Sequence, residues 1–155
     1  MIRIGIIGDI GSGKTYVAKN FGYPVFNADY EVSKLYKSDK KIFLELKKKL
    51  PKYIFSYPID KKQIASAILA NKQNLRKIIK IVHKKIRINM KLFLKKNKNK
   101  KIVILDIPLL LENKINKKND ILIFVDSKKV EIHKRLKKRE NYNAKPVSYT
   151  HLTLP

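Results

Sequence analysis

The stretch that decides the fold is "GDIGSGKT", Gly8–Thr15, which directly follows the apolar run "IRIGII" and precedes "YVAKNF". It matches the phosphate-binding pattern G-x-x-x-x-G-K-[ST] in full. Glycines let the backbone fold back so that successive N–H groups point at phosphate oxygens, and the start of the following helix adds partial positive charge. The lysine can reach the β- and γ-phosphates, and the hydroxyl can bind Mg²⁺. A glycine turn with an incidental lysine is the structural alternative.

The loop supplies one set of candidate residues for binding a nucleoside triphosphate. A buried strand before it and a helix after it are the context that a true phosphate-binding loop requires. Asp9 occupies a free position of the pattern, and we expect its side chain to point away from the anion. The candidate nucleotide-binding residues are Gly8, Ile10, Gly11, Ser12, Gly13, Lys14, Thr15 and Tyr16.

Apolar runs and amphipathic stretches alternate along the rest of the chain. Tyr23–Asp29, Ile102–Leu110 and Asp120–Asp126 are short apolar runs typical of buried strands. Between them, apolar residues recur every three or four positions over 30–50 and again over about 60–94, which predicts helices. Strands alternating with helices predict an α/β fold with a parallel sheet. With the glycine loop, this pattern indicates the three-layer fold of P-loop nucleotide triphosphatases, a parallel sheet flanked by helices.

Length and composition favour one soluble cytoplasmic domain of 155 residues, with a helical insertion. The 44% of hydrophobic residues suffice for a core, no cysteine is present, and no stretch approaches the ~20 apolar residues of a membrane span. We therefore expect no membrane partner. The last ten residues, "PVSYTHLTLP", contain no charged residue, so we expect 146–155 to be a non-native or disordered tail. An ordinary C-terminal strand is the alternative.

The formal net charge of +25 invites a nucleic-acid interpretation. Of the 37 basic residues, however, 32 are lysine and 5 are arginine, and they occur in nearly every segment. Base readout and bidentate phosphate contacts favour arginine, so we interpret the charge as mainly solvated lysine. A positive field would still attract a polyphosphate substrate. A basic nucleic-acid-binding ATPase stays open as an alternative.

Acidic residues at the ends of other strands are the next clue, since parallel sheets place their sites at the carboxyl edge. Asp29 follows the second predicted strand and Asp106 ends the third. An aspartate there can orient an acceptor hydroxyl, take its proton or hold Mg²⁺. A helix N-cap is the simpler reading of Asp29. Arg135 and Arg139 share one face of a basic helix, where they either clamp a phosphoryl group or are solvated.

In this order and spacing, "IGIIGDIGSGKT", "VFNADYEVSKLY", "IVHKKI", "ILDIPLLLE" and "RLKKRE" resemble the dephospho-coenzyme A kinases. The resemblance covers residue 1 to about 143 and implies a kinase domain over 1–145, with a helical acceptor-binding region over about 60–97 and a lid over about 128–143. It implies transfer of the γ-phosphoryl group of ATP, with Mg²⁺, to the ribose 3′-hydroxyl of dephospho-CoA. A monomer acting on small molecules is expected. Another P-loop small-molecule kinase and an inactive remnant stay open as alternatives.

The resemblance also implies roles for particular residues. The catalytic set is Lys14, Asp29, Arg135 and Arg139, with Thr15 and Asp106 at the metal. The acceptor-binding set is Asp29, His83, Pro108, Leu109 and Glu112. Two motifs depart from the family: Asn27-Ala-Asp29 replaces Asp-x-Asp, and His83-Lys84 replaces His-Pro. The family's final helix and strand are not recognisable here, so we expect an unpaired edge of the sheet.

Overall fold

The computed structural model describes residues 1–108 and 117–137, which divide into two compact units. The first contains residues 1–27 together with the described residues from 93 onward, and the second contains residues 28–92. The expected tail, 146–155, lies outside the described residues, as do Leu109 and Leu110 at the end of the third predicted strand.

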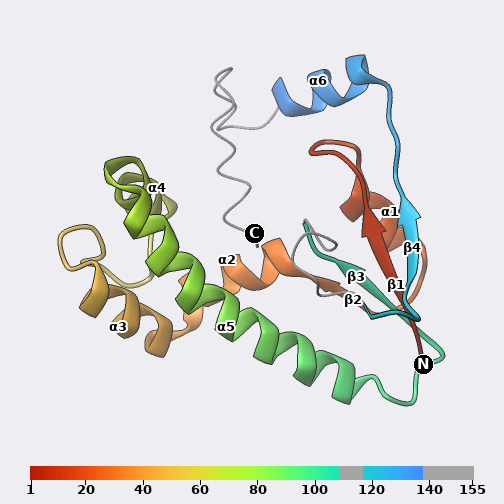
Figure 1. The fold of residues 1–155 in the computed structure, drawn as a ribbon, viewed down its shortest axis with the longest axis horizontal. Coiled ribbons are helices and arrows are strands. Elements are labelled where there is room, and N and C mark those ends of the chain that lie inside the picture. The colour runs from red at the N-terminus through yellow and green to blue at the C-terminus, as the bar shows by residue number, and fades with distance from the viewer. Residues whose placement is uncertain (109–116, 138–155) are drawn as a thin grey trace. The chain divides into compact units, whose positions relative to one another are not determined.

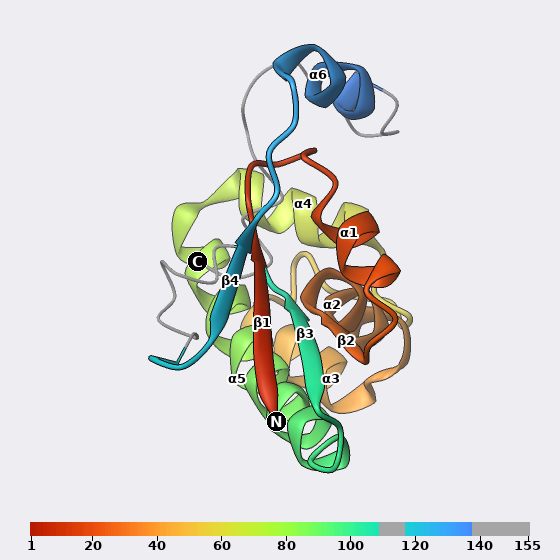
Figure 2. The same ribbon diagram turned by 90° about the vertical axis from the view of Figure 1, so that its right-hand side faces the viewer.

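The first unit is built on a parallel sheet, as the alternating pattern predicts. The described strands are β1 (Ile2–Ile7), β2 (Val25–Asn27), β3 (Ile102–Asp106) and β4 (Ile121–Phe124). They lie in the order β2-β3-β1-β4, and each neighbouring pair is parallel (Figure 2). Helix α1 (Lys14–Asn20) connects β1 to β2 and contacts β1, β2 and β3. The α/β class is therefore confirmed.

Branched aliphatic side chains fill the space between α1 and the sheet. Ile4, Ile6, Ala18 and Ile104 form a buried cluster, and Phe21, Val25, Ile102, Ile123 and Val125 pack against it. Phe26 of β2 also packs against Phe93, with 5.5 Å between the ring centroids. This rigid base holds the carboxyl ends of β1, β2 and β3 in register, with Asn27 opposite Asp106.

The described sheet ends at β4, which pairs with β1 on one side. Ile121 and Phe124 are 49% and 62% exposed, unlike the buried residues of the interior strands. Among the described strands, β4 is therefore an edge strand with exposed apolar side chains.

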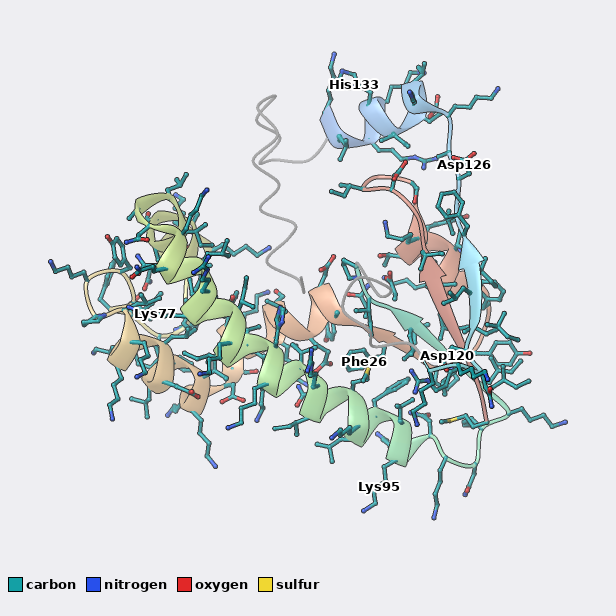
Figure 3. All side chains as sticks on the ribbon, viewed as in Figure 1. Phe26, Lys77, Lys95, Asp120, Asp126 and His133 are labelled. Carbon is teal, nitrogen blue, oxygen red and sulfur yellow. The ribbon has the colours of Figure 1, made fainter. Side chains whose placement is uncertain are left out.

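A buried ion pair ties β1 to the start of β4. Arg3 and Asp120 lie 2.8 Å apart, with side chains 8% and 4% exposed, and Asp120 also accepts a hydrogen bond from the Lys117 backbone N–H. Figure 3 labels Asp120 at this end of the sheet and Asp126 at the opposite end of β4. The pair fixes the segment from which β4 starts.

The second unit is helical and contains α2 (Ala28–Ser38), α3 (Lys40–Lys49), α4 (Lys61–Ala70) and most of α5 (Lys72–Lys96) (Figure 1). Asp39 and Asp60 begin α3 and α4 by accepting hydrogen bonds from backbone N–H groups of the first turn. The helical pattern predicted over 60–94 breaks at Asn71, because its side chain accepts a hydrogen bond from the Gln73 N–H where α5 begins. No helix among the described residues is long and apolar enough to cross a bilayer.

The core of the second unit is formed mainly by aliphatic side chains, and Tyr36 and His83 are buried with them. The buried aliphatic residues include Leu35, Ile42, Leu46, Ile54, Ile64, Ile78, Val82 and Ile86. Burial raises the pKa of Tyr36. His83 is 8% exposed, and its Nε2 has no hydrogen-bond partner within the described residues. Burial, with a smaller contribution from the nearby Arg87 charge, lowers the pKa of His83 to about 4.

The Arg3–Asp120 pair predicts a large loss of stability when one partner is removed. Asp120→Ala leaves a guanidinium buried without its carboxylate, so we expect the free energy of unfolding to fall by about 3 kcal/mol in urea denaturation. Glu45→Ala, at an exposed acid in α3, is the control and should change it by less than about 0.5 kcal/mol. Equal effects of the two substitutions would contradict the role given to the ion pair.

The pKa of His83 predicts an acid-sensitive second unit. Unfolded histidine titrates near 6.5 but folded His83 near 4, so between these pH values the unfolded chain binds more protons. The free energy of unfolding should therefore fall progressively as the pH drops from about 6.5 to about 4, and stay level with respect to this group above that window. His83→Leu should remove this slope, and His133→Leu, at an exposed position of the chain, should keep it. A slope unchanged in His83→Leu would refute the assignment.

Candidate active site

The glycine loop adopts the folded-back path that its sequence predicts. Gly8, Gly11 and Gly13 have φ angles of 140°, 83° and 99°, which side chains other than hydrogen rarely permit. A Cβ on Gly8 would lie 2.3 Å from the carbonyl oxygen of Val125, just beyond β4. Position 8 therefore requires glycine for two reasons: its φ angle, and the close approach of the Val125 backbone.

The Lys14 side chain folds back over the loop. Its Nζ donates to the carbonyl oxygens of Gly8 at 2.8 Å and Asp9 at 2.6 Å. The partial negative charges on these carbonyl oxygens hold the ammonium group at the loop. Of the other nucleotide-binding candidates, Ile10 and Tyr16 are 40% and 75% exposed, and Ser12 is buried.

A polar cluster joins the loop to the ends of two other strands. Thr15 Oγ1 donates to Asp106 Oδ2 at 2.7 Å, and Asn27 Nδ2 donates to the same oxygen. Asn27 Nδ2 also lies 3.4 Å from Thr15 Oγ1. Asp106 is 3% exposed. The two residues expected at a metal, Thr15 and Asp106, are thus brought within hydrogen-bond distance of each other.

The oxygen atoms of this cluster suit Mg²⁺. Magnesium commonly takes one or two protein oxygens and completes its shell with water and substrate phosphate. A hydroxyl and a carboxylate beside a phosphate-binding loop meet that requirement. Among residues 1–108 and 117–137, no group of three or more His, Cys, Asp or Glu side chains could hold a metal by protein ligands alone.

Arg135, in helix α6 (Lys129–Lys137), contacts the glycine loop. Arg135 Nη1 donates to the carbonyl oxygens of Ser12 at 3.1 Å and Gly11 at 3.3 Å. Ser127, between β4 and α6, donates its hydroxyl to the same Ser12 oxygen at 2.8 Å. Arg135, one of the two arginines singled out in the sequence, therefore contacts the phosphate-binding loop. Figure 3 labels His133 on the same helix.

The remaining predicted site residues divide into those that the structure describes and those that it does not. Asp29 is an exposed residue in the first turn of α2, and His83 is buried in α5; both belong to the second unit. Pro108 is half-buried, two residues after Asp106. Three predicted site residues lie outside the described residues: Leu109, Glu112 and Arg139.

Two contributors were not among the sequence candidates. In the sequence Asn27 is only a departure from the family motif, yet in the structure its amide donates a hydrogen bond to the Asp106 carboxylate. Ser127 was not singled out at all. Its signal was available, because a hydroxyl directly after Asp126 follows a strand at the carboxyl edge, where sites in parallel sheets gather.

Comparison with known proteins agrees with this geometry. The family model described as "Dephospho-CoA kinase" matches residues 2–150. A dephospho-CoA kinase of the Wolbachia of Brugia malayi is 34% identical over 141 residues, covering 88% of this chain and 72% of the relative. One from Bartonella henselae is 31% identical over 151 residues, covering 94% and 77%.

A solved structure shares the fold. The crystal structure of TT1252 from Thermus thermophilus superposes with a TM-score of 0.71 at 26% identity, covering 92% of this chain and 74% of that chain. The glycine loop, its aspartate partner and the family match over nearly the whole sequence together show that this chain belongs to the dephospho-CoA kinase family.

Proposed function

We propose that this chain transfers the γ-phosphoryl group of ATP to the ribose 3′-hydroxyl of dephospho-CoA, giving CoA and ADP, the last step of coenzyme A biosynthesis. The observation that carries the proposal is the glycine loop of a family member with Lys14 folded over it and Thr15 bonded to Asp106. A basic nucleic-acid-binding ATPase, which the charge alone left open, is disfavoured by the family match.

The loop and its lysine bind the polyphosphate of ATP. Backbone N–H groups of the glycine loop form the cradle, and Lys14 exchanges its bonds to the Gly8 and Asp9 carbonyls for bonds to phosphate oxygens.

Thr15, through its hydroxyl, and Asp106, through its carboxylate, would hold Mg²⁺. When bound, the metal would supply neutralisation of the negative charge on the phosphate oxygens. Asn27 keeps the Asp106 carboxylate oriented through its amide.

Asp29 orients the acceptor hydroxyl and takes its proton. One residue separates Asp29 from Asn27, so covalent connection keeps its backbone next to the end of β2. The other acceptor-binding residues that we propose are His83, Pro108, Leu109 and Glu112. Arg135 and Arg139 stabilise charge on the transferred group, and closure of the lid over about 128–143 excludes water, which would otherwise compete as acceptor.

The substrates are therefore small molecules, and we propose that the chain acts on them as a monomer in the cytoplasm. The net charge of +25 assists by attracting two polyanionic substrates.

The first test is the conversion of dephospho-CoA to CoA with Mg-ATP, followed by chromatography. We expect CoA from the wild-type chain and a loss of at least about a hundredfold in Lys14→Ala, because the transition state loses a cation at the phosphates.

Nucleosides, nucleotides and shikimate serve as rival acceptors. Turnover on one of these but not on dephospho-CoA would refute the substrate. ATP hydrolysis stimulated by DNA or RNA, with a steep salt dependence, would point to the nucleic-acid alternative.

A second test concerns Asp29. Asp29→Asn keeps the size of the side chain but removes its basicity, so kcat should fall by about 10²–10⁴-fold while the affinity for ATP changes little. Asp9→Asn is the matched control, since that exposed side chain has no proposed role, and it should leave kcat within about twofold. Full activity of Asp29→Asn would show that another group receives the proton.

A further inference from the structure

Two side chains from outside the glycine loop converge on one backbone oxygen within it. Ser127 Oγ donates to the Ser12 carbonyl oxygen at 2.8 Å, and Arg135 Nη1 donates to the same oxygen at 3.1 Å. Arg135 Nη1 also lies 3.3 Å from Ser127 Oγ, so the two donors are linked to each other. All three residues belong to the first unit.

This oxygen belongs to the peptide between Ser12 and Gly13. A trans peptide is planar, and its C=O and N–H groups point to opposite sides. Holding the Ser12 carbonyl toward Ser127 and Arg135 therefore turns the Gly13 N–H away from them. The neighbouring peptide behaves in the same way: the Gly11 carbonyl faces Arg135, and the Ser12 N–H points back into the loop to the Asp9 oxygen at 3.1 Å.

The Ser12–Gly13 peptide benefits from such a restraint because the residue after it is glycine. Glycine has access to a much wider range of φ and ψ than other residues, so the peptide before Gly13 can rotate at lower cost. Rotation of the Ser12–Gly13 peptide would turn a carbonyl oxygen, instead of an N–H group, toward a bound phosphate. That would convert attraction into repulsion.

We infer that Ser127 is a positioning residue which, with Arg135, fixes the Ser12–Gly13 peptide so that the Gly13 N–H faces the phosphates. The inference rests on the proposed function in that the anion is the polyphosphate of ATP, but it concerns binding and not the identity of the acceptor. Arg135 thus orients the loop backbone in addition to stabilising charge on the transferred group.

The test is the affinity for inorganic tripolyphosphate, measured by isothermal titration calorimetry on the full chain. Ser127→Ala removes a neutral hydroxyl, so it leaves the electrostatic field unchanged and should weaken binding about five- to tenfold, as expected for one lost hydrogen bond. Ser127→Thr keeps the hydroxyl and should restore the affinity. Ser38→Ala is the matched control, because Ser38 Oγ also donates to a backbone carbonyl, that of Lys34, at 2.8 Å, in the second unit.

A kinetic measurement separates positioning from a general loss of structure. In Ser127→Ala the KM for ATP should rise, while the KM for dephospho-CoA and the midpoint of thermal unfolding match those of Ser38→Ala. In an Arg135→Gln background, Ser127→Ala should cost less than in the wild type, since both donors act on one carbonyl.

The positioning role of Ser127 and the proposed kinase function are tested by different outcomes. Equal tripolyphosphate affinity in Ser127→Ala and Ser38→Ala would overturn the positioning role, as would a Ser127→Ala defect that Ser127→Thr does not restore. The Ser127 variants could show the predicted tripolyphosphate affinities in a chain that does not phosphorylate dephospho-CoA. That result would support this inference and overturn the proposed function. A wild-type chain that binds no tripolyphosphate would overturn both.

Discussion

The carboxylate of Asp106 is the group on which the site depends. It ends β3, the strand between β1 and β2, and accepts hydrogen bonds from Thr15 at the start of α1 and Asn27 at the end of β2. Three segments distant in sequence are thereby tied at one edge of the sheet. The arrangement follows from strand order, because only a strand inserted between β1 and β2 can place its last residue beside both.

The glycine loop is held through its carbonyl groups, by one side chain of its own and by two from outside it. Lys14 binds those of Gly8 and Asp9, while Ser127 and Arg135 bind those of Gly11 and Ser12. When donors occupy the carbonyl oxygens, the N–H groups of the same peptides are directed elsewhere, which suits an anion-binding loop. The loop's function thus depends on residues more than a hundred positions along the chain, at the end of β4 and in α6.

Much of this was predictable from the sequence, and what was not has physical reasons. The P-loop, the parallel sheet and the position of Asp106 near the glycine loop follow from local patterns and from one rule about parallel sheets. The boundaries were less predictable: β2 is shorter than Tyr23–Asp29 because α2 already begins at Ala28, and the helical pattern over 60–94 breaks at Asn71. Ser127 carries no periodic signal, and only its place directly after a strand, at the carboxyl edge of the sheet, could have indicated it. The burial of His83 depends on packing that spacing does not reveal.

The most direct test of the central claim, that the γ-phosphoryl group passes to dephospho-CoA and not to water, is a ³¹P NMR time course with Mg-ATP and dephospho-CoA. The account predicts that ADP and a new ribose phosphomonoester resonance grow in equal amounts, with little inorganic phosphate. ADP accompanied by an equal amount of inorganic phosphate, and no new phosphomonoester, would contradict it.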